Sequence, residues 1–163
     1  MEEVRVKLVL FAGEENDRIA VFDEVGGSRR CTIRLREQFF QTLADIFFNP
    51  GEPYLGPEFA VRMLQRAGVA VDSIALSVVD RETGTVRYAV SLRQGGMSWT
   101  TDAFSLDAFG FSIVSGVPVS MTEADFVFLM EYSCMVDEHP EPEELRTAEH
   151  LARDLPKDKL GQA

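Results

Sequence analysis

Histidine is scarce in this sequence of 163 residues: its two histidines, His139 and His150, both lie near the C-terminus. The rest of the chain therefore offers no histidine for a Ser-His-Asp triad, a Cys-His dyad or a histidine-based metal site. The sequence also lacks a GxxxxGK[ST] loop and a GxGxxG turn after a strand, two motifs by which backbone amides cradle phosphates. Catalysis built on histidine or on a glycine-rich phosphate loop is thus excluded from the main body of the chain.

Cysteine is equally rare, and Cys31 and Cys134 are far apart with no CxxC spacing. Two isolated cysteines of this kind predict buried, reduced thiols in a cytosolic protein. No apolar run approaches the ~18 residues of a membrane-spanning helix. The acidic N-terminus, MEEVRVKLVLF, is typical of a strand and not of a signal peptide. We therefore expect a cytoplasmic protein with no membrane partner.

Basic residues are outnumbered: 16 Lys and Arg stand against 27 Asp and Glu, which gives a formal net charge of −11. This balance argues against a dominant basic groove for nucleic acid, because phosphate contacts need clustered Lys and Arg. It is compatible with a local basic patch, or with a metal that bridges acidic residues to phosphate. A chain of this length can bury roughly 70% of its unfolded surface, so one globular domain needs no disulfides or structural metal.

Alternating apolar and polar residues, separated by glycine-rich or charged turns, predict most of the strands. The first three strands, near residues 3–10, 18–23 and 29–35, should form an antiparallel meander because their connections are short. A fourth covers 69–78, and a hairpin pairs 86–92 with 97–101 around Gln94-Gly95-Gly96. We interpret Trp99, within that hairpin, as a core residue. Pro118 suggests that the short strand 117–121 lies at a sheet edge.

Helical spacing of apolar residues appears four times, over residues 37–48 and in segments that begin near Pro57, Ser105 and Thr122. Gly116 should end the third of these helices. Thr122 with Asp125 resembles a capping box at the start of the fourth. These elements together predict an α+β fold: a mostly antiparallel sheet, made of a strand meander plus a hairpin, with packed helices. From Asp137 onward the composition becomes charged and includes three prolines. We accordingly divide the chain into a domain over residues 1–136 and an acidic, partly helical tail over 137–163.

Carboxylates are the remaining candidates for chemistry. Asp102 and Asp107 bracket a strand-to-helix corner, and Glu58 opens an earlier helix. Such oxygen ligands suit a hard divalent cation, but an acid at a helix N-terminus also stabilises the free amides and the positive end of the helix dipole. Arg34 and Arg36 follow one another along the third strand, where they form either a phosphate-binding patch or a solvated strand face.

Three stretches resemble the bifunctional nuclease (BFN) domain family over about Glu3 to Tyr132. They read IRLREQFFQTLADIFF, PYLGPEFAVRMLQRAGVAVDSIALSVVDRETGTVRYAVSLRQGG and TDAFSLDAFGFSIVSGVPVSM. The most specific features are a Gly-Thr-hydrophobic hairpin at Gly84-Thr85 and a Gly-x-Pro-hydrophobic step at Gly116. The resemblance implies an α+β fold, often dimeric, in a family some of whose members degrade both DNA and RNA.

The chain departs from the family pattern at three places. Before the first helix, Arg34, Leu35 and Arg36 replace Trp-Ile-Gly, and Phe39 replaces a glutamate. Phe104, Ser105 and Leu106 stand where the family commonly has Arg-Pro-Ser between two aspartates, and Gly56, Pro57 and Glu58 replace Thr-His-Asp. Two hypotheses follow. The first is a nuclease in which Asp102, Asp107 and Glu58 act as catalytic residues. The two aspartates would hold Mg²⁺ or Mn²⁺, and Arg34 and Arg36 would bind the nucleic-acid phosphate. The second is a non-catalytic, homodimeric interaction or ligand-binding module on the same scaffold, which the replaced residues favour.

Overall fold

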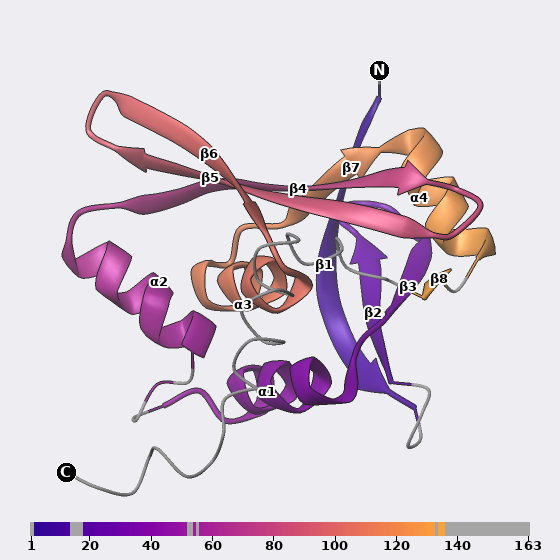
Figure 1. Ribbon diagram of the computed structural model, residues 1–163, viewed down its shortest axis with the longest axis horizontal. Helices are drawn as coiled ribbons and strands as arrows, with labels where there is room; N and C mark the ends of the chain where they lie inside the picture. Colours follow the sequence, from indigo (N-terminus) through magenta and orange to yellow (C-terminus); the bar gives the residue numbers. More distant parts are fainter. Residues whose placement is uncertain (1, 14–17, 52–53, 55, 133, 136–163) are drawn as a thin grey trace, which may run out of the picture.

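A computed structural model describes residues 2–13, 18–51, 54, 56–132 and 134–135 (Figure 1). Its strands form a single sheet in the order β6-β5-β4-β7-β1-β2-β3-β8, with antiparallel pairing except at β4–β7 and β3–β8. The predicted α+β class and the mostly antiparallel sheet are confirmed. The strands are β1 (Glu3–Ala12), β2 (Ile19–Glu24), β3 (Arg30–Arg34), β4 (Ala70–Asp80), β5 (Thr85–Gln94), β6 (Met97–Ala103), β7 (Val119–Thr122) and β8 (Cys134–Met135).

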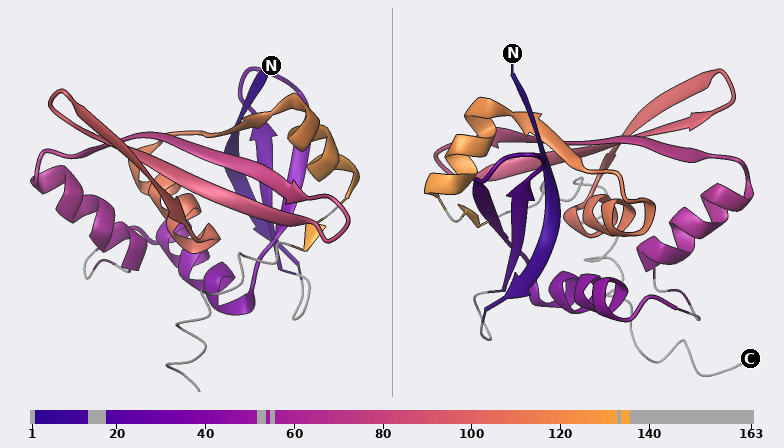
Figure 2. Two further views of the ribbon diagram at one scale, coloured as in Figure 1. Left: turned by 45° about the horizontal axis from the view of Figure 1, so that its top comes forward. Right: turned by 180° about the vertical axis from the view of Figure 1, so that it is seen from behind.

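Four helices accompany the sheet: α1 (Glu37–Phe48), α2 (Gly56–Arg66), α3 (Ser105–Ser115) and α4 (Glu123–Glu131). Helices α1, α2 and α3 lie on one side of the β4–β5 pair, whereas α4 lies at the far end beside β3 and β7 (Figures 1 and 2). No helix among these is both long and apolar enough to cross a membrane. The proposed tail, residues 137–163, lies outside the described residues, as do both histidines.

The predicted meander is confirmed by β1, β2 and β3, which pair in chain order. Alternate residues of these strands are buried because one face of the sheet covers the core: Val6, Phe22 and Ile33 are at most 1% exposed. The alternation that predicted strands thus also identified the core face. Cys31 belongs to this core, and burial raises the pKa of its thiol to about 12, in line with the expected buried thiol.

The strand expected at a sheet edge is instead central. β7 lies between β4 and β1, parallel to the first and antiparallel to the second, and so joins the two halves of the sheet. The edge prediction was wrong because Pro118 precedes the strand, which begins at Val119, so the ladder never needs an amide hydrogen from the proline.

Helix α3 packs against the inner face of the sheet and fixes the geometry of the strand-to-helix corner before it. Phe109 is 1% exposed, and its ring centroid lies 5.0 Å from that of Phe22 and 5.1 Å from that of Tyr88. Gly116, at a φ of 75°, ends the helix in the left-handed conformation as its sequence position predicted. Since Phe22 lies on β2 and Tyr88 on β5, this one side chain ties both halves of the sheet together.

Candidate functional site

The corner between β6 and α3 does not bring its two aspartates to one side of the sheet. Asp102 is paired with Ala89, and it is exposed on the face opposite to that of Tyr88, the residue that contacts α3. Asp107 lies in the first turn of α3 itself, half-buried against the inner side. Phe104 occupies the N-cap, and no side chain caps the helix by a hydrogen bond. Neither aspartate is therefore an N-cap, and only Asp107 is placed to interact with the helix dipole.

Asp107 and Glu58 lie on α3 and α2, two helices that contact each other at Gly110 and Pro57. A β-carbon added at Gly110 would lie 2.3 Å from the Cβ of Pro57, so the two backbones meet at these residues. Asp107 precedes Gly110 by one helical turn, and Glu58 follows Pro57 directly. Burial raises the pKa of the Asp107 carboxyl above its usual value. Two of the three predicted acids thus flank one helix crossing, and the third does not.

Glu58 is almost completely buried, with 2% of its surface exposed. An Oε1 atom of Glu58 lies 3.9 Å from a guanidinium nitrogen of Arg62, one turn later on α2, and Arg62 stacks over the ring of Tyr54 with 5.6 Å to its centroid. Arg62 Nε is buried and has no hydrogen-bond partner among the described residues. Sequence reasoning missed Arg62, although its i,i+4 spacing from Glu58 signalled the pair.

A complete cage of acidic ligands is not found in the part of the chain that the structure describes. No three His, Cys, Asp or Glu side chains among these residues are grouped so that they could hold a metal ion. Mg²⁺, however, is commonly held by only one or two carboxylates together with substrate phosphates. Of the three predicted acids, Asp107 and Glu58 flank the α2–α3 crossing, whereas Asp102 points to the other face of the sheet.

The two arginines predicted to bind phosphate lie away from this crossing. Arg34 ends β3, which is next to the last strand at the end of the sheet order opposite to β6, and its side chain is half-buried. Arg36 is exposed and directly precedes α1, where it occupies the N-cap position without a side-chain hydrogen bond. Among the predicted site residues, then, Glu58 and Asp107 lie on the two helices that cross, whereas Asp102 is on the outer face of β6, Arg34 ends β3 and Arg36 precedes α1.

One cavity of about 310 Å³ opens between the last turn of α2, the start of β4 and the last turn of α3. Gln65, Val69, Val71 and Ser115 are among its lining residues, none of which carries an ionisable group. The cavity is therefore separate from the acidic residues and offers no group for acid–base chemistry.

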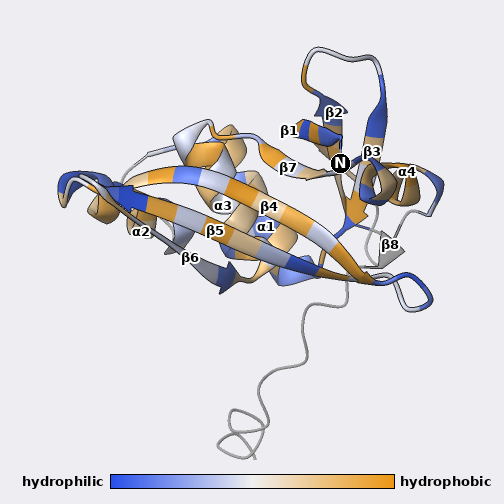
Figure 3. Ribbon diagram, turned by 90° about the horizontal axis from the view of Figure 1, so that it is seen from above, coloured by the Kyte–Doolittle hydropathy of each residue, from blue (hydrophilic) through white to orange (hydrophobic). Residues whose placement is uncertain are grey.

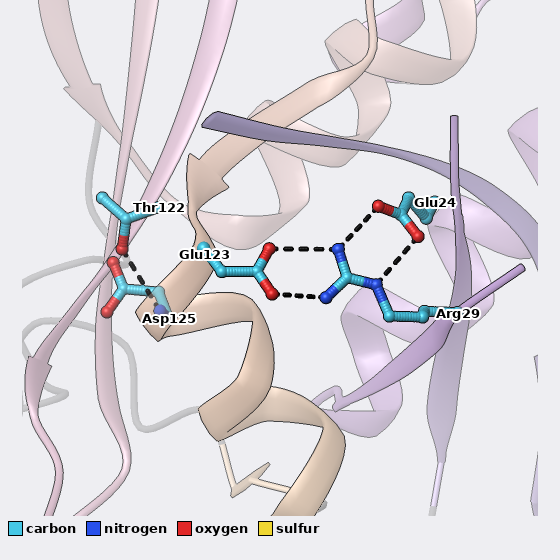
Figure 4. A network of polar contacts seen from close by, with 5 residues as sticks. All are labelled: Glu24, Arg29, Thr122, Glu123 and Asp125. Atoms are coloured by element: carbon cyan, nitrogen blue, oxygen red, sulfur yellow. Dashed lines mark hydrogen bonds and ion pairs between the residues drawn. The ribbon is translucent and has the colours of Figure 1, made fainter. Parts of the chain in front are cut away.

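A network of ion pairs that sequence reasoning did not identify joins α4 to the β2–β3 hairpin. The Arg29 guanidinium donates hydrogen bonds to Glu24, at 2.7 and 2.9 Å, and to both carboxylate oxygens of Glu123 (Figure 4). These contacts hold the pKa values of both carboxyls below their usual range. Next to them, Thr122 Oγ1 accepts a hydrogen bond from the Asp125 amide at 3.2 Å, which confirms Thr122 as the predicted helix cap.

In this network one guanidinium, that of Arg29, is shared by the two carboxylates of Glu24 and Glu123. Arg29 also stacks over Phe126 at 4.8 Å, and Arg81 pairs with Asp125 at 3.1 Å. Charged groups from β2, the β2–β3 turn and α4 are thus paired with one another. We interpret the network as a structural clamp for α4 and not as an active site.

The β5–β6 arm, residues Thr85–Ala103, lies at the opposite end of the sheet. Within the described residues it has an unpaired strand edge and exposed apolar side chains. Among the described strands β6 pairs only with β5, and Figure 3 shows it at the margin of the sheet. Met97, Trp99 and, just beyond the strand, Phe104 are 65%, 42% and 42% exposed. The interpretation of Trp99 as a core residue was therefore wrong: the helices cover Tyr88 on the same face but leave Trp99 nearly half exposed.

Comparison of the sequence with protein-family models finds no match, and comparison with curated proteins finds none either.

Proposed function

We propose that this domain is a non-catalytic interaction module that binds a partner polypeptide along the edge of β6. The observation that supports the proposal is that β6 is exposed and that no described strand pairs with its outer edge. Six of the seven residues of β6 are exposed, and among the described strands none pairs with its outer side. Proteins usually protect such an edge with lysine, proline, a bulge or a covering element, because its backbone groups can template another strand.

Within the part of the chain that the structure describes, none of these protections is found on β6. Its sequence, MSWTTDA, contains no lysine and no proline, and its pairing with β5 is continuous from Met97 to Ala103 without a bulge. An added strand would gain main-chain hydrogen bonds along the edge and side-chain contacts with Met97 and Trp99. This is the mode of recognition known as β-augmentation.

The test is a binding selection with a displayed library of short random peptides, carried out in parallel on the natural chain and on two variants. Thr101→Lys places a charge on the free edge, whereas Ser77→Lys places the same charge on β4, an internal strand. Peptides that bind the natural chain and Ser77→Lys but not Thr101→Lys would support the proposal. Equal binding of peptides to both variants would contradict it. A selection that enriches no peptide, from a chain that is also monomeric, would contradict it as well.

A second candidate is a nuclease of the BFN type, which the crossing of α2 and α3 favours. Glu58 and Asp107 flank this crossing, and Arg62 carries a buried Nε that is without a hydrogen bond among the described residues. The two carboxylates would hold a divalent cation, Mg²⁺ or Mn²⁺, which would activate water toward a phosphodiester. Arg62 would bind the nucleic-acid phosphate, and Asp102 would take no part because it faces away.

Cleavage of single-stranded DNA and RNA, measured with Mg²⁺, with Mn²⁺ and with EDTA, distinguishes this candidate from the first. The informative variants are Asp107→Asn and Glu58→Gln, with Asp102→Asn as the matched control on the opposite face. Metal-dependent cleavage that is lost in the first two variants and kept in the control would support a nuclease. Cleavage that survives all three variants, or no cleavage by the natural chain, would argue against this site.

A further inference from the structure

We propose that the acidic C-terminal segment, residues 137–163, folds back on its own chain and covers the exposed face of α2 with an amphipathic helix. The inference goes beyond the proposed function, because it does not involve the β6 edge. Three features support it: the charge and exposure of α2, the place where the described chain ends, and the sequence pattern of the segment.

Helix α2 presents an apolar and basic surface on a chain whose formal charge is −11. Phe59 and Met63 are 56% and 46% exposed, and side chains four residues apart lie on one face of a helix. Arg62 and Arg66 lie beside them, whereas the only acid of α2, Glu58, is 2% exposed. The exposed surface of α2 thus suits an acidic segment that has an apolar face.

The two arginines of α2 are available to such a segment. Arg62 lies 3.9 Å from Glu58, which is longer than a hydrogen bond, and its side chain is 39% exposed. Arg66 is exposed and pairs with no carboxylate among the described residues. Hydrogen bonds between a guanidinium and a carboxylate are stronger than those between neutral groups. An acidic segment would therefore gain contacts here that the chain has not already made.

Helix α4 also exposes apolar side chains, but its charge disfavours an acidic partner. Val127 and Met130 are 38% and 44% exposed. All ionisable residues of α4 are acidic: Glu123, Asp125 and Glu131. Because like charges repel each other, an acidic amphipathic segment is directed to α2 and away from α4.

The described chain ends where it can lead to α2. β8 is parallel to β3 and pairs Met135 with Arg34, just before α1 begins at Glu37. From there α1 runs toward α2 (Figures 1 and 2), and its 12 residues are about 18 Å long. Residues 136–144, if extended, span roughly 30 Å. They are thus long enough to follow α1 and to bring the residues after them to α2.

The segment after residue 144 has the pattern that this surface requires. Apolar residues recur there at intervals of three or four, which predicts one apolar helix face: Leu145, Ala148, Leu151 and Leu155. Residues 137–163 contain eight Asp and Glu against four Lys and Arg, so their net charge is opposite to that of exposed α2. A tethered segment is also present at an effective concentration on the order of millimolar, so modest affinity is sufficient for docking.

The test is hydrogen–deuterium exchange of the full chain, measured by mass spectrometry. We expect protected amides in residues 145–155, because exchange then requires the segment to leave α2, whereas an undocked helix of this length is marginal in water. Met63→Glu should lower this protection by about tenfold, since it places a carboxylate in the apolar contact. Met130→Glu, the same change at similar exposure on α4, is the matched control and should leave protection unchanged.

A second pair of variants tests the charge. Arg66→Glu should lower the protection by about two- to fivefold, the usual range for losing an exposed ion pair, while Arg5→Glu, at an exposed position of β1, should not. Circular dichroism of each variant establishes that it is folded.

Three outcomes would overturn the inference. The first is a natural chain whose amides in residues 145–155 are unprotected. The second is protection that Met130→Glu abolishes and Met63→Glu does not, which would place the segment on α4. The third is protection that depends on protein concentration, which would assign the contact to a second molecule. None of these outcomes changes the test of peptide binding at β6.

Discussion

The two ends of the sheet differ in how completely their side chains are satisfied. At the β3–α4 end, Arg29 is shared by two carboxylates and stacks on an aromatic ring, and the charged groups around it are paired. At the β5–β6 end, Met97 and Trp99 are exposed on a strand that has no described neighbour on one side. Both ends share one sheet and one core. The difference therefore lies in the charged groups, which are paired at the first end, because apolar side chains are exposed at both: Val127 and Met130 of α4 are 38% and 44% exposed.

The strongest test of this comparison replaces one aromatic residue in each environment. Phe109→Ala removes a ring that is 1% exposed and packed between Phe22 and Tyr88, so we expect it to lower the free energy of unfolding by about 3–5 kcal/mol. Trp99→Ala should cost about 1 kcal/mol or less in the monomer, because its side chain is already partly hydrated. Urea denaturation followed by circular dichroism at low protein concentration measures both. Equal losses would show that Trp99 belongs to the core.

A smaller loss of stability is expected from two glycine substitutions, one at the crossing of α2 and α3 and one in the turn between β5 and β6. Gly110→Ala places a methyl group 2.3 Å from the Cβ of Pro57, so α2 must shift from α3, at a cost of about 1–3 kcal/mol. Gly96→Ala meets no atom within 4 Å and should change stability by about 0.5 kcal/mol or less. Thermal unfolding of the two variants gives the comparison. A stable Gly110→Ala variant would show that the contact with Pro57 is loose.

The smallest effect concerns the pH dependence of the Arg29 clamp. Its hydrogen bonds lower the pKa values of Glu24 and Glu123 in the folded chain. The stability that they add is therefore present above the unfolded pKa of glutamate, about 4.3, and is lost as pH falls through the lower folded values. Arg29→Met should flatten the fall in melting temperature below about pH 4.5, while Arg5→Met, at an exposed position of β1, should not. An unchanged acid profile in Arg29→Met would mean that other carboxylates dominate.

Local pattern in the sequence located the elements well. Residues 37–48 were predicted as a helix with the bounds that the structure gives, and Gly116 was identified as the residue that ends α3. Both depend on neighbours within a few residues, on helical spacing in one case and on tolerance of positive φ in the other. The capping role of Thr122 was predictable for the same reason, since its partner amide lies three residues away.

The candidate site was less predictable, because its residues come together only through contacts between elements. Glu58 and Asp107 were selected as acids near helix starts, but their shared crossing depends on the fit of Pro57 against Gly110. Asp102 was grouped with Asp107 by closeness in sequence. Side chains alternate along a strand, however, and the pairing of Asp102 with Ala89 directs it to the other face of the sheet.

The sequence by itself determined the α+β class, the meander, the four helices and the absence of histidine chemistry from the main body of the chain. Only the tertiary structure decided that β7 is central, that Trp99 is exposed and that Asp102 faces away from Asp107. The physical reason is the range of the interactions. Periodicity and capping act over a few residues, whereas strand order and burial depend on which distant segments cover a surface.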